Sequence, residues 1–154
     1  MILTKTLFAS ALLASSALAG AAMAETVGFS QIGSESGWRA AETTLTLQQA
    51  KERGIDLKFS DAQQKQENQI KALRSFIAQG VDLIVVDPVD EVAIVPALEA
   101  ANDAGIPILM LVKKPEGGEW ASRIYLDQIN HAYTACDYLA SQLGEGATVA
   151  QLQG

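Results

Sequence analysis

The chain has 154 residues, with 18 acidic and 11 basic side chains and a net charge of −7 at neutral pH. An acidic chain without a run of Lys and Arg is a poor match for nucleic acid or for an anionic membrane surface, so neither is expected as a partner. The single cysteine excludes an internal disulfide, and the single histidine excludes a metal site built on paired histidines.

Residues 1–24 have the three parts of a secretory signal peptide. Lys5 gives a basic start, residues 7–18 form an apolar run, and Ala22-Met23-Ala24 is a small-residue cleavage site. The apolar run is shorter than the roughly 20 residues that span a bilayer. We therefore expect cleavage after Ala24, export, and a mature chain with no membrane span.

Residues 25–154 alternate between strand-like and helix-like segments. Six strands are expected, at 27–30, 55–60, 81–86, 106–112, 122–126 and 147–152. Helices are expected at about 37–53, 66–79, 95–104 and 130–143, and each is followed by a glycine. Alternation of this kind predicts an α/β fold: an open, doubly wound, mostly parallel sheet with helices on both faces.

Three segments carry more detailed expectations. In the helix at 66–79, Ile70, Leu73 and Ile77 share one face, and Gln69 is expected to point away from it. Residues 81–86 are apolar with hardly any alternation, which is typical of a strand buried on both faces. Cys136 lies among alanines and leucines at helical spacing and is expected to be a buried, unreactive thiol.

Polar side chains follow most of the expected strands, at the edge where a parallel sheet binds its ligand. Carboxylates and amides each bind hydroxyl groups, and an indole can cover the apolar face of a sugar ring. These groups suit a small, neutral, hydroxyl-rich ligand. The alternative is that Asp and Gln here only cap helices and complete turns, as in any α/β fold. The polar residues after the strands are Asp61, Gln63, Asp87, Lys113, Lys114, Asp127 and Gln128.

No enzyme motif is found. The glycines at 28, 33 and 37 have the wrong spacing for a dinucleotide-binding loop, and Glu35 stands where a nucleophile elbow needs serine. Asp87, Asp90 and Glu91 could be ligands of a hard metal ion, but acids are also favoured in turns and at helix N-termini. We expect neither catalysis nor a cofactor nor a bound metal.

Three stretches resemble the first lobe of the sugar-binding periplasmic proteins of ABC importers. They are GFSQIGSESGWRAAE at 28–42, DAQQKQENQIKALRSFIAQGVDLIVVDPVD at 61–90 and GATVAQLQG at 146–154. The first two look most like the galactofuranose-binding branch. The resemblance implies a two-lobed clamp in the periplasm, which closes on a monosaccharide about a hinge and delivers it, as a monomer, to a permease in the inner membrane.

The same resemblance implies roles for particular side chains. Glu35 and Arg39 would bind sugar hydroxyls, and Trp38 would stack on the ring or wall it. Trp38 could instead be an aromatic side chain of the core. The full set of sugar-binding residues expected from the resemblance is Ser34, Glu35, Trp38, Arg39, Asp61, Gln63, Asp87 and Lys113.

The sequence departs from the family in two ways. Sugar binders of this type usually end the fourth strand in an Asp-Arg pair that clamps the sugar, whereas Val112 and Lys113 stand here. Each charge-assisted hydrogen bond of such a clamp contributes roughly 1.5–3 kcal/mol, so the identity of the sugar is open. The chain also covers only the first lobe, 25–154, with the crossing to the second lobe expected at Gln153 and Gly154.

Two other readings fit the same residues. The protein could be a periplasmic sensor that presents a sugar or an autoinducer to a chemoreceptor or a histidine kinase. It could also be a truncated, nonfunctional remnant of a binding protein. An exported enzyme and a transcription regulator are disfavoured, because no paired acid and base and no DNA-binding head are found.

Overall fold

A computed structural model of the chain describes residues 25–150. The expected signal peptide at 1–24 lies outside the described residues, as do Gln151 and Leu152 of the expected sixth strand. The elements in chain order are β1 (Thr26–Gln31), α1 (Gly37–Arg53), β2 (Asp56–Asp61), α2 (Gln66–Gln79), β3 (Leu83–Val86), α3 (Val95–Asp103), β4 (Ile108–Leu111), β5 (Ser122–Ile124) and α4 (Gln128–Leu143).

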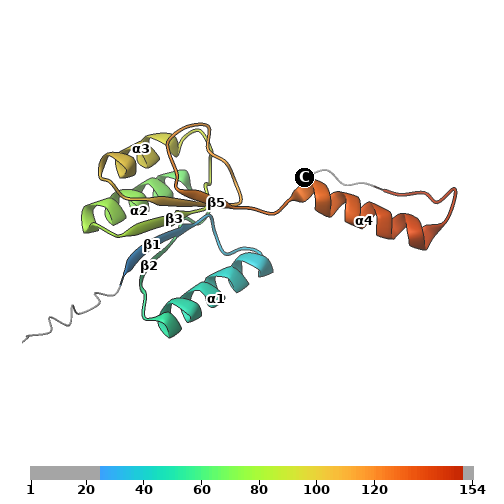
Figure 1. Ribbon diagram of the computed structural model, residues 1–154, viewed down its shortest axis with the longest axis horizontal. Coiled ribbons are helices and arrows are strands. Elements are labelled where there is room, and N and C mark those ends of the chain that lie inside the picture. Colours follow the sequence, from blue (N-terminus) through green and yellow to red (C-terminus); the bar gives the residue numbers. More distant parts are fainter. Residues whose placement is uncertain (1–24, 151–154) are drawn as a thin grey trace, which may run out of the picture.

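The five strands form one parallel sheet in the order β2-β1-β3-β4-β5. Helix α1 lies on one face of this sheet, and α2 and α3 lie on the other (Figure 1). Right-handed crossovers explain this, because the connection from β1 to β2 runs in the opposite direction to those from β2 to β3 and from β3 to β4. The expected α/β class and the doubly wound parallel sheet are confirmed.

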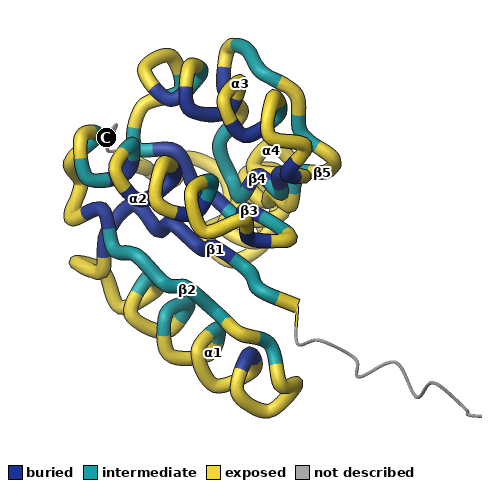
Figure 2. Tube along the Cα trace, turned by 90° about the vertical axis from the view of Figure 1, so that its left-hand side faces the viewer, coloured by how far each residue is buried: buried dark blue, intermediate teal, exposed yellow. Residues whose placement is uncertain are grey.

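The core lies between the sheet and the α2–α3 layer. Ile84, Val86, Ile108 and Met110 point to this side and are completely buried. Their neighbours Leu83, Val85, Leu109 and Leu111 point to the other face and are only half-buried. The prediction that residues 81–86 are buried on both faces is therefore wrong for the second face. Among the described elements only α1 lies on that side, near β1 and β2 (Figures 1 and 2).

Helix α2 has the predicted ends, with Gly80 as its left-handed C-cap at a φ of +65°. Its packing against β1 requires a glycine at position 28, where a Cβ would lie 2.6 Å from the ring of Phe76. The prediction that Gln69 points away from the buried face of α2 is wrong. Gln69 is fully buried, because its amide is hydrogen-bonded inside the core and needs no solvent.

Helix α1 forms over the predicted range although its central threonines have poor helix propensity. The side chain of Ser36 caps the N-terminus by accepting a hydrogen bond from the Arg39 N–H at 3.2 Å. Gly54 ends the helix in the left-handed region, with a φ of +70°. The hydroxyls of Thr43 and Thr44 donate to backbone carbonyls one turn back, which satisfies them within the helix.

Helix α4 extends away from the sheet, and every one of its residues is exposed (Figure 1). The prediction of a buried thiol at Cys136 is therefore wrong, since α4 has no covering layer in the described part of the chain. Residues 147–150 do not form a strand, so this part of the expected sixth strand is wrong as well. None of the described helices is both long enough and apolar enough to cross a membrane.

Candidate functional site

The predicted site residues lie at the carboxyl edge of the sheet, around the ends of β1, β2 and β3. Strands β1 and β3 are neighbours, but the chain leaves β1 toward α1 on one face and leaves β3 toward α3 on the other. Such a reversal opens a crevice between two strand ends, and open α/β sheets bind their ligands there. The side chains at this crevice come from α1 and from the segment after β3.

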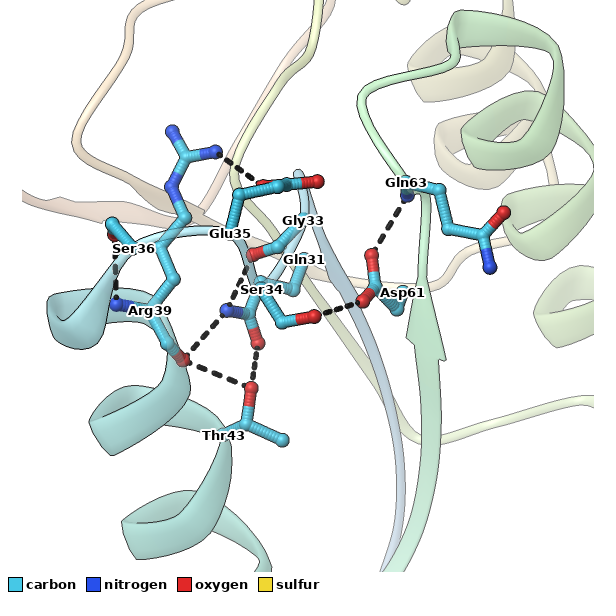
Figure 3. Close-up of polar contacts among 9 residues, drawn as sticks. All are labelled: Gln31, Gly33, Ser34, Glu35, Ser36, Arg39, Thr43, Asp61 and Gln63. Carbon is cyan, nitrogen blue, oxygen red and sulfur yellow. Dashed lines mark hydrogen bonds and ion pairs between the residues drawn. The ribbon is translucent and has the colours of Figure 1, made fainter.

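Gln31, the last residue of β1, fixes the segment that carries most of these side chains. It is 1% exposed. Its Nε2 donates to the carbonyl oxygens of Gly33 and Arg39, both at 2.9 Å, and its Oε1 accepts from the Thr43 hydroxyl at 2.6 Å (Figure 3). Gln31 therefore ties the loop and the first turn of α1 to the end of β1. Our sequence reasoning missed this residue, although a lone amide among the apolar residues of a strand end was a usable signal.

Ser34, Asp61 and Gln63 are brought together beside this loop (Figure 3). The Ser34 hydroxyl donates to Oδ2 of Asp61 at 2.8 Å, and the Gln63 N–H donates to Oδ1 at 2.7 Å. Gln63 has a φ of +53°, in the left-handed region that the following turn requires. Both oxygens of Asp61 thus have partners within the chain, and at this position the turn-forming alternative has direct support.

Glu35 and Arg39 form an ion pair one helical turn apart. The nearest nitrogen and oxygen are 3.9 Å apart, and both side chains are partly exposed. A long, solvent-exposed pair of this kind contributes little, since side-chain entropy and solvent screening offset the attraction. Most of the donor capacity of the guanidinium therefore stays available for a ligand.

Trp38, Arg39 and Asp87 line a common cavity of about 220 Å³. Trp38 is 59% exposed, so the alternative of a core aromatic is wrong. Its indole forms one apolar wall, and Arg39 and Asp87 supply a donor and an acceptor. The residues that line the cavity are Ser36, Trp38, Arg39, Glu42, Asp87, Val112 and Leu126.

Asp87 is the most deeply buried ionisable group of this cavity, at 7% exposure. Its Oδ1 has no hydrogen-bond partner among residues 25–150. Burial raises the pKa of Asp87 to about 6, and the neighbouring Glu42 raises it as well, against the lowering effects of Arg39 and Lys113. Burial likewise raises the pKa of Glu42, which Arg39 partly offsets. Asp87 and Glu42, together with Glu35, thus share the Arg39 guanidinium.

The backbone beneath Asp87 is held by Gln69 of α2. Its Nε2 donates to the Asp87 carbonyl at 2.8 Å, and its Oε1 accepts from the Val89 N–H at 2.9 Å. Nearby, Oδ1 of Asp90 accepts from the N–H groups of Val92 and Ala93 at 2.9 and 2.8 Å. These two hydrogen bonds lower the pKa of Asp90. Asp90 therefore completes a turn ahead of α3.

Lys113 is close to the cavity but its ammonium points elsewhere. Its Nζ donates to the Val89 carbonyl at 3.1 Å and pairs with Glu91 at 3.6 Å. Val112 lines the cavity instead, with a φ of +52° that is rare for a β-branched side chain. Sterically strained backbone of this kind costs of order 1–3 kcal/mol and is common at functional sites.

Two other candidates are weaker. Among residues 25–150, no group of three or more His, Cys, Asp or Glu side chains is arranged to hold a metal ion. A larger hollow of about 500 Å³ lies between α1 and the sheet, but aliphatic side chains dominate its lining, including Val27, Leu45, Leu83 and Val85. It lacks the converging polar groups that bind a hydroxyl-rich ligand.

Residues 27–154 match the family model of the periplasmic binding protein domain. The chain is 44% identical to the galactofuranose-binding protein YtfQ of Escherichia coli over 97% of its own length and 48% of that protein. It is 34% identical to the ribose import binding protein RbsB of Bacillus subtilis, over 69% of this chain and 35% of the relative. The chain thus spans half or less of the length of these curated relatives.

Solved structures of periplasmic binding proteins are also similar to this chain. The periplasmic binding protein of the arabinose ABC transporter from Shewanella sp. ANA-3, solved with α- and β-L-arabinofuranose, is 48% identical with a TM-score of 0.71. That match covers 76% of this chain and 40% of the other. A crystal structure of a galactofuranose-binding protein is 47% identical with a TM-score of 0.71, over 77% and 41% of the two chains.

Proposed function

The chain belongs to the periplasmic binding protein family, and on this premise we propose that it is the sugar-binding component of an ABC importer, or the first lobe of one. In this proposal residues 25–154 form the N-terminal lobe, and the sugar lies between this lobe and a second one. The relatives that bind galactofuranose, ribose and arabinofuranose support a monosaccharide as ligand.

The observation that carries the proposal is the cavity shared by Trp38, Arg39 and Asp87 at the carboxyl edge of the sheet. It combines an exposed indole face, a guanidinium with most of its donors available and a buried carboxyl group without a partner. A sugar offers matching groups, since its hydroxyls both donate and accept and the C–H face of its ring packs on an aromatic ring.

The roles that we propose for the remaining residues follow from their places around this cavity. Glu35 lies beside Arg39 at the rim, where its carboxylate can accept a hydrogen bond from a sugar hydroxyl. Ser34, Asp61 and Gln63 form the neighbouring rim, where the oxygens of Asp61 border the cleft. Lys113 borders the opposite side, where it reaches the sugar only if its contacts with Val89 and Glu91 open.

We propose that the protein acts in the periplasm as a monomer, after cleavage following Ala24, and that it delivers its sugar to a permease of the inner membrane. The described helices, none of which could cross a membrane, and the family of its relatives are compatible with this. Mass spectrometry of the exported protein tests the first step. A mature N-terminus at Glu25 supports the proposal, and a retained leader contradicts it.

Ligand screening tests the sugar-binding proposal directly. The protein from the complete gene, exported and purified, is titrated with arabinose, galactose, ribose and their furanose-locked glycosides by calorimetry and Trp fluorescence. Saturable binding of at least one of these monosaccharides supports the proposal. Absence of binding to every sugar of the panel by a folded protein contradicts it.

A further inference from the structure

The resemblance implies a sugar-clamping carboxylate directly after β4, and this chain has no carboxylate at that position. Related sugar binders are expected to carry an Asp-Arg pair directly after the fourth strand, where this chain has Val112 and Lys113. The Val112 side chain has no hydrogen-bonding group, and the Lys113 ammonium is directed to Val89 and Glu91. Neither residue can supply the acceptor that the clamp needs.

Asp87 lies close to Val112, the position directly after β4. Strands β3 and β4 are neighbours, with Val86 opposite Met110 in register. Asp87 and Val112 therefore follow directly on adjacent strand ends, and both line the cavity of about 220 Å³.

Asp87 has a buried carboxylate oxygen that is free to accept a hydrogen bond from a ligand. The residue is 93% buried, and its Oδ1 accepts no hydrogen bond from any described residue. A buried carboxylate oxygen without a donor costs free energy, which a ligand hydroxyl would recover. On the same cavity wall, the Arg39 guanidinium offers donors to the oxygen atom of a hydroxyl.

We propose that Asp87, directly after β3, and Arg39 of α1 replace the clamp that the resemblance implies after β4, and that together they bind two adjacent hydroxyls of the sugar. This inference rests on the proposed function. It fixes the orientation of the sugar in the cavity. The hydroxyl-bearing edge of the ring faces Asp87 and Arg39, and the opposite edge lies against the apolar side chains of Val112 and Leu126.

The charges around the cavity restrict the ligand class further. The groups that face Asp87 are Arg39 and Glu42 from α1 and Lys113 from the segment after β4. Glu35, Glu42 and Asp87 surround the Arg39 guanidinium, and the Lys113 ammonium is paired with Glu91. With these carboxyl groups ionised, an anionic sugar such as a uronate is repelled. The site therefore fits a neutral monosaccharide with vicinal hydroxyls.

Transferring the carboxylate from position 87 to position 112 tests the proposal. Asp87→Ala is compared with the unmodified protein and with the double variant Asp87→Ala/Val112→Asp, using the complete exported protein and the sugar that it binds most tightly. We expect at least a tenfold loss of affinity in Asp87→Ala and recovery of most of that loss in the double variant. Asp103→Ala, an exposed acid at the end of α3, is the matched control and keeps the affinity unchanged.

A second readout separates a ligand contact from a structural role. Because sugar hydroxyls stabilise the ionised form of Asp87, we expect the affinity to fall as the pH is lowered through 6, and expect Asp87→Asn to remove that dependence. Unchanged affinity in Asp87→Ala overturns this inference and leaves the proposed function standing. A folded protein that binds no sugar at all overturns both.

Discussion

Gln31 Nε2 donates to the Arg39 carbonyl oxygen across 2.9 Å, and this hydrogen bond ties the end of β1 to the first turn of α1. The same amide also holds the Gly33 carbonyl and the Thr43 hydroxyl. A single buried side chain therefore sets the position from which Trp38 and Arg39 face the cavity.

Gln31→Leu is expected to lower both stability and sugar affinity. The substitution keeps the buried volume but leaves the Gly33 carbonyl without its partner. It also removes the contacts of Gln31 with the Arg39 carbonyl and the Thr43 hydroxyl, which remain hydrogen-bonded to each other. A buried polar group left without a partner costs about 1–3 kcal/mol, so the free energy of unfolding should fall by about that amount in urea denaturation. Gln48→Leu, on the exposed side of α1, is the control and should change little. Equal stability of the two variants would show that the Gln31 contacts are unimportant.

Trp38→Ala is expected to abolish sugar binding without unfolding the protein. The indole is 59% exposed, so its removal leaves no cavity in the core, and surface substitutions usually change stability by less than about 0.5 kcal/mol. Calorimetric titration should show a loss of affinity of at least tenfold, and Trp38→Phe should keep part of the affinity. Wild-type affinity in the alanine variant would remove Trp38 from the site.

Gly28→Ala is expected to destabilise the contact between β1 and α2. A Cβ at this position would lie 2.6 Å from the Phe76 ring, so the helix must move away from the strand. Overpacking of this kind costs typically about 1–3 kcal/mol. The matched control is Gly37→Ala, because a Cβ there meets nothing within 4 Å. Thermal unfolding should show a lower Tm for Gly28→Ala alone, and a common Tm for both variants would contradict the packing argument.

Asp87 is expected to make the folded protein less stable as the pH rises. Its pKa is raised from 3.8 to about 6 in the folded state, so the native state binds more protons than the unfolded state between those values. The contribution of Asp87 to stability therefore falls as the pH increases from 4 to 6. Measured by urea unfolding without ligand, Asp87→Asn should gain stability relative to the unmodified protein over this window. A difference that stays constant with pH would mean that the pKa of Asp87 is not raised.

Local sequence signals were sufficient to predict most of the helices and strands. Gly54 and Gly80 mark the ends of α1 and α2, and both adopt the left-handed conformation that a helix C-cap uses. The apolar runs located the strands of the parallel sheet, and Asp87 was chosen as a candidate because it directly follows one of them. The resemblance to sugar binders pointed to Trp38, which hydrophobic periodicity alone would have placed equally well in the core.

The features that were missed depend on contacts between distant parts of the chain. Gln69 was placed on the solvent face by its polarity, but its amide pairs with backbone groups at 87 and 89, which periodicity cannot reveal. Cys136 has core-like spacing on α4, yet burial also needs a covering layer, and none is present in the described part of the chain. The positive φ of Val112 likewise has no signal in the residue type.

Sugar titration of the complete exported protein, at pH 7.5 with Trp fluorescence and calorimetry as readouts, tests the central claim most directly. The account predicts saturable binding of a neutral monosaccharide, with a fluorescence change that Trp38→Phe reduces. A folded protein that binds none of the pentoses and hexoses tested, in pyranose or furanose form, would contradict it.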